Sequence, residues 1–306
     1  MSDTLDNSAI SKHLGRSSQY KSTYDPSLLV REPRINNRKH LNIEDDSLPF
    51  FGCDVWNGFE VSALLDSGLP TVFVAKVVYP CDSKYIVESK SMKLYWNSFN
   101  MEKLGKDVCE VFRNIKERAS TDLSELLETD VKVQLFNPIE LEYRSDDFLY
   151  DHSSYECLED KFNTLDINVY SETPELLKDN KTSSEYWESD QSFKVFSRLL
   201  KSNCRVTSQP DWGDVYIYMK GQTVPTHDSL MKYIISFRDE CHFHEEICET
   251  IYSRLWDRYN PSELSVACLY VRRGGWDINP QRCSHEYLIE KKMWNELVPW
   301  SKTGRQ

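Results

Sequence analysis

Several runs of alternating or β-branched residues predict strands. Residues 71–79 read TVFVAKVVY, a composition typical of a strand. A turn is expected at 80–83, after which residues 85–94 are predicted to return as the partner strand. Residues 131–136 alternate apolar and polar side chains, which indicates a half-exposed strand. Apolar runs predict further strands at 215–219 and 264–271.

Helical spacing of apolar residues predicts helices elsewhere. Residues 101–120 carry an apolar face at intervals of three and four. A second helix is expected after Pro225, and a third from His244 to the stop at Asn260-Pro261. Residues 193–200 are interpreted as a short helical approach to Cys204.

These elements divide the chain into four parts. Residues 1–45 are polar with little periodicity and are interpreted as an N-terminal arm. Residues 46–140 and 191–306 each mix strands with helices and are expected to be two domains. Residues 141–190 form an acidic connector, in which 165–170 could be one strand. Antiparallel sheet with helices packed on one face, an α+β class, is the predicted arrangement.

Composition narrows the function classes. The chain has 306 residues, 28% of them charged, with a net charge of −12. This charge argues against a large nucleic-acid surface, because such surfaces depend on Lys and Arg. The start of the chain has no secretory pattern and no stretch is apolar enough to span a bilayer. With nine cysteines and no framework spacing, we expect a cytoplasmic protein with reduced thiols.

The segment around Cys204 and Asp211 contains the first candidate chemistry. A thiol can attack an electrophilic carbon, and a nearby carboxylic acid can manage the proton that the adduct needs. A buried inert cysteine and a turn aspartate would explain both residues equally well. The polar neighbours Asn203, Arg205 and Ser208 favour a functional site, and Arg205 could help to hold a thiolate.

A second candidate lies at the predicted start of the third helix, where His244 precedes Glu245. A carboxylate there is favoured by the helix dipole alone. In a pocket, Glu245 could instead accept hydrogen bonds from ligand N–H donors, with His244 handling a proton. Within residues 241–248, His244, Glu245 and Cys248 imitate a metalloprotease helix motif with Cys in place of its second His, but a third ligand is not evident, so no metal site is expected.

Two further stretches suit a phosphate. Residues 88–93 read ESKSMK, which places hydroxyl and ammonium donors after a carboxylate. Residues 272–275 read RRGG at a predicted strand end. Solvent-exposed charges on a strand or a rim would explain both. A Rossmann fingerprint is not present, so a dinucleotide would not bind on such a unit.

Taken together, these stretches resemble the NADPH-dependent 7-cyano-7-deazaguanine reductase family (QueF) in its long, tandem-domain form. The match runs in order from about residue 15 to 285, and ten short stretches carry it. They are LPF at 48–50, DVW at 54–56, ESKSMKLY at 88–95, NSFN at 97–100, SNC at 202–204, QPDWG at 209–213, SFR at 236–238, FHE at 243–245, RRGG at 272–275 and DINP at 277–280.

The resemblance implies two tandem tunnelling-fold (T-fold) domains, a homodimer, and an enzyme. The implied reaction reduces the nitrile of 7-cyano-7-deazaguanine (preQ0) to the aminomethyl group of preQ1 with two NADPH, in queuosine biosynthesis. A small-molecule substrate is thus implied, with neither nucleic acid nor membrane as a partner.

The resemblance also implies roles for single residues. Cys204 resembles the nucleophile that forms a covalent thioimide, and Asp211 resembles the residue that gives and takes protons around it. The implied substrate-binding residues are Val87, Glu88, Ser89, His244 and Glu245. The implied NADPH-binding residues are Ser89, Lys90, Arg273 and Gly274. A metal is not implied.

Two other functions remain open at this point. One is a T-fold amidinotransferase, which uses the same cysteine on a nitrile base within tRNA. The 88–94 block and the acidic charge argue against it. The other is a non-catalytic purine-binding module, against which the intact pair of Cys204 and Asp211 argues.

Overall fold

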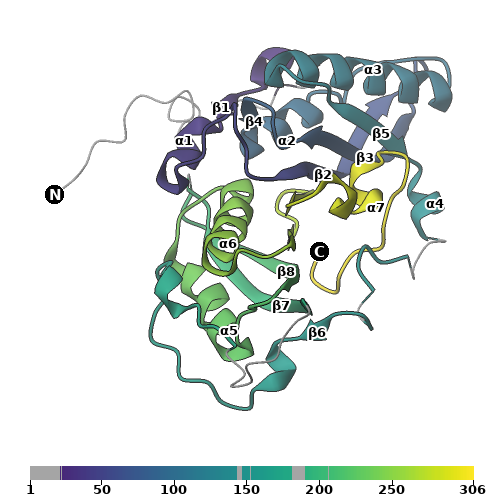
Figure 1. Cartoon of the computed structure of the whole chain (residues 1–306). Helices are drawn as coiled ribbons and strands as arrows, with labels where there is room; N and C mark the ends of the chain where they lie inside the picture. Colours follow the sequence, from purple (N-terminus) through teal and green to yellow (C-terminus); the bar gives the residue numbers. More distant parts are fainter. Residues whose placement is uncertain (1–20, 22, 143–146, 152, 181–189, 206) are drawn as a thin grey trace.

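The computed structural model describes residues 21, 23–142, 147–151, 153–180, 190–205 and 207–306. Its centre is an eight-stranded sheet in the order β5-β3-β2-β10-β9-β8-β7-β6 (Figure 1), in which β6 pairs in parallel with β7 and the other pairs are antiparallel. The strands of this sheet are β2 (Phe51–Leu64), β3 (Pro70–Pro80), β5 (Lys132–Phe136), β6 (Glu156–Cys157), β7 (Gln191–Asn203), β8 (Pro210–Gly221), β9 (Glu263–Tyr270) and β10 (Trp276–Cys283). A small second sheet pairs β1 (Arg31–Pro33) with β4 (Tyr85–Val87).

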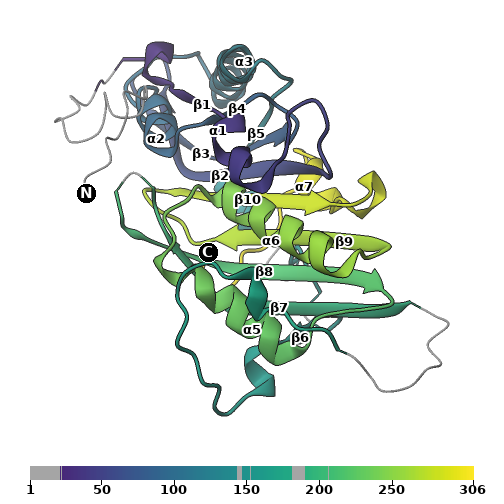
Figure 2. The same cartoon turned by 60° about the vertical axis from the view of Figure 1, so that its left-hand side comes forward.

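Helices gather on one face of the large sheet, α2 and α3 over its N-terminal half and α5 and α6 over its C-terminal half (Figure 2). The α-helices are α1 (Ile35–Arg38), α2 (Ser89–Asn97), α3 (Val108–Leu127), α4 (Pro138–Glu142), α5 (His227–Ser236), α6 (His244–Tyr259) and α7 (Lys291–Trp294). Beneath them lie two separate apolar cores, one for each half. The α+β class with helices on one face is therefore confirmed.

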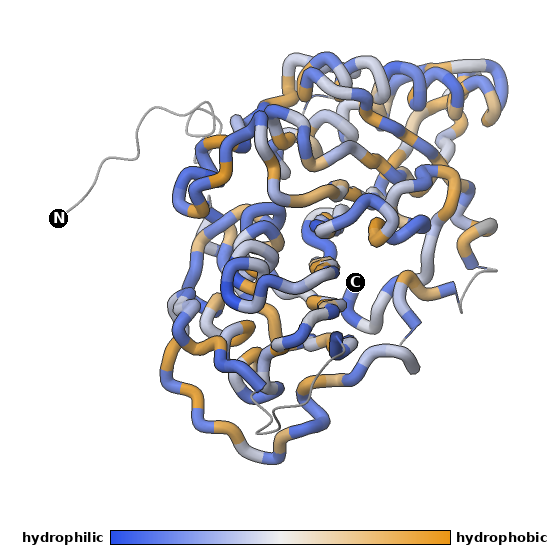
Figure 3. Tube along the Cα trace, in the orientation of Figure 1, coloured by the Kyte–Doolittle hydropathy of each residue, from blue (hydrophilic) through white to orange (hydrophobic). Residues whose placement is uncertain are grey.

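The two halves join where β10 pairs with β2 along eight residues, from Trp276 opposite Gly58 to Cys283 opposite Phe51. A strand from the end of the chain thus completes the sheet of the N-terminal half. A smaller apolar core on the opposite face includes Tyr150, Met293 of α7 and Trp300. Hydrophobic and hydrophilic positions are interspersed along the described trace (Figure 3).

Buried charges reinforce the joint between the halves. Arg282 on β10 pairs with Asp54 on β2 (2.8 Å) and with Glu249 on α6 (2.9 Å). Arg34 and Arg38 complete this cluster from the helix-covered face. Although burial opposes its ionisation, the three arginines lower the pKa of Glu249 to about 2. Removing one member would leave a buried charge without its partner, which is strongly destabilising.

Some sequence predictions are wrong in detail. Residues 85–94 do not form the partner strand of β3, which pairs instead with β2 and β5. The segment turns helical at Ser89, because Glu88 caps α2 and because Met92, Tyr95 and Trp96 fall on one buried face. The helix expected at 101–120 begins only at Val108, after the capping residue Asp107.

The C-terminal half brings two more corrections. Residues 193–200 lie within β7, not in a helix, and Phe193 and Val195 alternate inward as in a strand. Strand β10 was not predicted, because one of its buried faces is polar. In the connector, outside this half, residues 165–170 form no strand either.

The segment before residue 45 also differs from the expected arm. Its described part includes Leu29, Arg34 and Arg38, which are all buried. The expectation that this segment stays outside the packed protein is therefore wrong for these residues. Residues 1–20 lie outside the described part of the chain.

In the part of the chain that the structure describes, none of the helices combines the length and the apolar character needed to cross a bilayer.

Candidate functional site

A cavity of about 210 Å³ lies on the helix-covered face, where α2 and α6 both begin. It therefore takes residues from both halves of the chain. Its lining includes Val87, Glu88, Ser89, Lys90, Cys204, Asp211, His244, Glu245 and Arg273, and also Trp56, Lys93, Thr207, Gln209, His242, Phe243, Val271, Trp276 and Ile278. The structure thus brings together the predicted site residues, with Gly274 next to the lining residue Arg273.

Cys204 is the first residue of the loop between β7 and β8. Its N–H donates to the carbonyl of Gln209 (2.8 Å), and its own carbonyl accepts from the N–H of Ser208 (2.9 Å). Ser208 adopts the left-handed conformation with a φ of 52°. These bonds hold the half-buried Cys204 at the cavity wall.

Arg205 fastens this loop to its surroundings. Its guanidinium donates to Asn37 Oδ1 (2.6 Å) and forms an ion pair with Glu246 on α6 (3.0 Å). The sequence suggested Arg205 as a partner for a thiolate, but its ion pair in the structure is with a carboxylate. We therefore assign it the role of positioning the loop.

Asp211 enters β8 opposite Ser202, and only 3% of it is exposed. One oxygen faces His244 Nε2 at 3.3 Å, and the other forms an ion pair with Arg273 Nη1. Burial works against ionisation, but the hydrogen bonds and charges of His244 and Arg273 outweigh it and hold the pKa of Asp211 below its usual value. Asp211 is therefore a carboxylate whose two oxygens face His244 and Arg273.

His244 and Glu245 occupy the first two positions of α6, where the helix begins after Phe243. The imidazole of His244 stacks on Tyr270, with ring centroids 3.8 Å apart. His244 Nδ1 and Glu245 Oε1 are buried, and neither has a hydrogen-bond partner in the described part of the chain. Buried polar atoms without partners are costly, so these two are positioned to meet a ligand.

Burial, reinforced by the nearby charge of Asp54, raises the pKa of the Glu245 carboxyl to about 8. This group therefore holds its proton near neutral pH. Ligand N–H donors that favour the carboxylate would release that proton.

Glu88 is the residue that caps α2. Its carboxylate accepts from the N–H groups of Lys90 (2.9 Å) and Ser91 (2.7 Å). Val87 ends β4 beside it and is buried. Glu88 is 6% exposed. The other explanation offered by the sequence, a solvent-exposed charge on a strand, therefore does not apply to it.

The hairpin between β9 and β10 carries Arg273 and Gly274. Gly274 and Gly275 have φ values of 56° and 75°, and the N–H of Arg273 donates to the carbonyl of Trp276 (2.9 Å). Two consecutive left-handed residues form the tight turn that glycine favours. A Cβ on Gly274 would come within 3.2 Å of Lys93, so this turn packs directly against α2.

The residues beside this turn suit an anionic cofactor. Lys90, Lys93 and Arg273 all line the cavity. Burial and the nearby charge of Arg273 lower the pKa of Lys93. Lys93 and Arg273 therefore lie close together, and two neighbouring cations favour the binding of a phosphate between them.

The sequence did not single out all of the lining residues. Trp56 and Trp276 contribute aromatic surface, and Thr207 and Gln209 follow the nucleophile candidate. Trp56 lies in the DVW stretch used for the resemblance, whereas the position of Trp276 depends on β10, which was not predicted.

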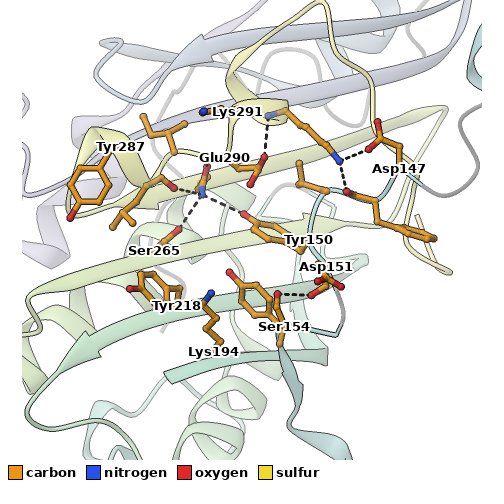
Figure 4. A pocket seen from close by; sticks show the side chains of 17 residues that line it. Asp147, Tyr150, Asp151, Ser154, Lys194, Tyr218, Ser265, Tyr287, Glu290 and Lys291 are labelled. Atoms are coloured by element: carbon orange, nitrogen blue, oxygen red, sulfur yellow. Dashed lines mark hydrogen bonds and ion pairs between the residues drawn. The ribbon is translucent and has the colours of Figure 1, made fainter. Parts of the chain in front are cut away.

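A larger cavity of about 1010 Å³ lies on the opposite face, beside α7 (Figure 4). Tyr218, Ser265 and Gln281 are among its lining residues, and none of the predicted site residues lines it. Gln281 Nε2 donates to Ser265 Oγ (3.0 Å), which is one of several contacts within the lining. Its residues therefore contribute nothing to the candidate site.

The resemblance of residues 241–248 to a zinc motif is explained by packing. Cys248 is buried and its thiol contacts the carbonyl oxygens of Val266 (3.5 Å) and Pro280 (3.6 Å). Over the described ranges, groups of three or more His, Cys, Asp or Glu side chains in a metal-binding arrangement are not found.

Comparison with known families gives two matches. Residues 20–135 match the family described as the N-terminal part of nitrile reductase, 7-cyano-7-deazaguanine-reductase. Residues 210–288 match a family described as QueF-like protein.

Curated relatives match most of the chain. A protein of Colwellia psychrerythraea is 37% identical over 301 residues, which cover 96% of this chain and 95% of the relative. Proteins of Rickettsia bellii and Legionella pneumophila are each 40% identical, and the alignments cover 91% and 93% of this chain and 93% of each relative. All three are named NADPH-dependent 7-cyano-7-deazaguanine reductase.

Among solved structures, the apo form of archaeosine synthase QueF-Like aligns with a TM-score of 0.28 and 17% identity. The alignment covers 32% of this chain and 95% of that one.

Proposed function

This chain belongs to the family of NADPH-dependent 7-cyano-7-deazaguanine reductases, and we propose that it reduces the nitrile of that base to an aminomethyl group with two molecules of NADPH. The observation that carries the proposal is the convergence of Cys204, Asp211 and the unpartnered Glu245 on one cavity. The product, preQ1, would serve queuosine biosynthesis in the cytoplasm. We infer a homodimer as the working form.

Substrate recognition rests on the two helix starts. The deazaguanine edge presents N–H donors, which Glu245 can accept once it has lost its proton. The side chain of Glu88 already caps α2, so it would use its remaining lone pairs from the other side of the cavity. His244 Nδ1 is available for one more polar contact.

The covalent step begins with proton transfer from the Cys204 thiol to the Asp211 carboxylate. The sulfur then adds to the nitrile carbon, one carbon–nitrogen π bond breaks, and the proton passes from Asp211 to the nitrogen. The product is a thioimide, whose C=N bond is a better hydride acceptor than the nitrile.

Lys90, Lys93 and Arg273 would hold NADPH, with Ser89 and Gly274 beside them, and bound NADPH supplies a hydride in each of the two reductions. Reduction of the thioimide needs a further proton on nitrogen, and Asp211, which has already passed on the thiol proton, would take this one from solvent and deliver it. The Cys204 thiolate then leaves and takes up a proton from solvent, and the iminium that remains would accept the second hydride to give the amine.

The test follows NADPH absorbance with 7-cyano-7-deazaguanine and the intact mass of the protein, for wild type and for Cys204→Ala. We expect substrate-dependent oxidation and an adduct on Cys204, both lost in the variant. An adduct without NADPH oxidation would favour the amidinotransferase, and binding without either would favour a purine-binding module.

A further inference from the structure

Arg273 in this structure is held by three side chains of the nucleophile segment. Its guanidinium forms the ion pair with Asp211 Oδ1, donates to Gln209 Oε1, and reaches Thr207 Oγ1 at 3.4 Å. The side chain of Arg273 remains 30% exposed, so a ligand can reach it. The residue proposed to bind the cofactor is therefore engaged with the residue proposed to move the proton.

The two steps proposed for Asp211, addition of the thiol and reduction of the adduct, need opposite protonation states of its carboxyl group. Formation of the thioimide begins with Asp211 as a carboxylate, because it must accept the thiol proton. Reduction needs it as an acid, because nitrogen must receive a proton with the hydride. A guanidinium bonded to a carboxylate favours the first state and opposes the second.

We propose that Arg273 is a latch that couples the two stages: paired with Asp211 it keeps the base form for nucleophilic addition, and on leaving for a cofactor phosphate it releases Asp211 to act as an acid. This inference rests on the proposed function. The adjacent glycines give the hairpin the backbone freedom that such a movement needs. Lys93, which packs against Gly274, provides the second cation toward which Arg273 and a phosphate would converge.

Other groups also act on Asp211. His244 faces it from α6, and Lys93 on α2 and Tyr270 on β9 interact with its charge, while Cys204 lines the same cavity from the β7–β8 loop. The latch involves only Arg273, because it is permanently charged and its side chain is partly exposed. His244 is fixed by its stacking on Tyr270, so it stays with Asp211 when Arg273 leaves.

The test measures the rate of adduct formation on Cys204 by mass spectrometry, without NADPH, between pH 4 and 9. In the wild type, protonation of Asp211 should lower the rate only at the acid end of this range or below it, because the pKa of Asp211 lies below its usual value. In Arg273→Met this fall should move to higher pH by roughly one unit or more, the usual effect of removing an arginine from an aspartate. Arg272→Met is the matched control, because Arg272 bonds the carbonyl of Gln306 instead, and its profile should match the wild type.

A second arm uses the wild type alone, so it does not depend on the folding of a variant. Saturating NADP⁺, which cannot reduce the adduct, should move the fall in rate upward as Arg273→Met does. Coincident profiles for wild type and Arg273→Met, or a wild-type profile that NADP⁺ leaves in place, would overturn the latch. Failure of the proposed function looks different, because the wild type would then form no adduct at any pH.

Discussion

The starts of α2 and α6 place two carboxylates at the same cavity, but the two differ in their hydrogen bonds. Glu88 precedes α2, and both of its oxygens accept backbone N–H groups of that helix. Glu245 lies inside α6 at its second position, and its Oε1 is buried without a partner in the described part of the chain. The first carboxylate stabilises the fold, whereas the second is buried at a cost to it.

This difference separates a carboxylate that also caps a helix from one whose Oε1 has no partner within the described residues. The bonds of Glu88 are made whether or not a substrate is present. The missing bonds of Glu245 can be supplied only by something that enters the cavity. The same residue type at two helix starts should therefore respond to substitution in opposite ways.

The largest effect is expected for substrate affinity in Glu245→Gln. The amide can accept only one N–H and presents its own NH₂ to the other, so about 1.5–3 kcal/mol of binding should be lost. This corresponds to a dissociation constant roughly ten- to hundredfold higher. Calorimetry in the Cys204→Ala background measures binding without the adduct.

Glu263→Gln is the matched control for that experiment. Glu263 starts β9, at the opposite end of the strand from Tyr270, and pairs with Lys220. Its replacement should leave affinity unchanged. Equal affinity of Glu245→Gln and the parent would contradict the role of Glu245.

The pH dependence of binding should distinguish the carboxylates next. Because the pKa of Glu245 is raised to about 8, the free carboxyl is protonated below that pH, and a ligand with two N–H donors must displace the proton. The dissociation constant should fall by up to about tenfold per pH unit from pH 6 to 8 and then level off. Calorimetry in buffers of different ionisation heat should detect proton release, which Glu245→Gln abolishes. Affinity independent of pH would refute this.

Stability should move in the opposite direction from affinity in the same variant. The pKa of Glu245 in the folded state lies above its unfolded value, so the group destabilises the fold increasingly as pH rises toward 8. Glu245→Gln should therefore raise the free energy of unfolding at pH 8 by about 1–3 kcal/mol, and by less at pH 5. Urea unfolding at both values tests this, and a loss of stability at pH 8 would count against it.

The smallest effect is expected for Glu88→Ala. Loss of the cap of α2 should lower the free energy of unfolding by about 1 kcal/mol. Glu88→Gln keeps an acceptor and should lose less. The same urea titrations provide the measurement, and unchanged stability in both variants would show that the two cap bonds contribute little.

Much of the C-terminal half follows from the sequence. Strands β8 and β9 and helices α5 and α6 lie where apolar spacing predicts them, because apolar residues recur along each at the spacing of a strand or a helix. Apolar spacing does not predict strand β10, because polar residues are buried on one of its faces, namely Asp277, Asn279 and Gln281. Their partners include Asn57 and Ser265, which come from other strands. A buried polar face satisfied by distant residues has no signature in hydropathy.

The site was predictable as a set of residues but not as an arrangement. Motif resemblance named residues near 88, 204, 211, 244 and 273, and all of these line one cavity. Their local structure is predicted wrongly in two places. Residues 193–200, which belong to β7, are predicted as a helix, and residues 85–94, which include part of α2, are predicted as a strand. Glu88 and Cys204 meet across the two halves only because β10 pairs with β2, which spacing cannot reveal. The roles of the individual residues remain predictions.

The pairing of β10 with β2 also constrains how the chain can be made. While a ribosome has released only the first two hundred residues, one edge of β2 lacks its neighbour and exposes a row of free N–H and C=O groups. That edge is closed only after residues 276–283 emerge, so the N-terminal half cannot finish folding before synthesis is nearly over. Contacts this distant in sequence favour slow folding, and chaperone contact during translation is expected to centre on β2.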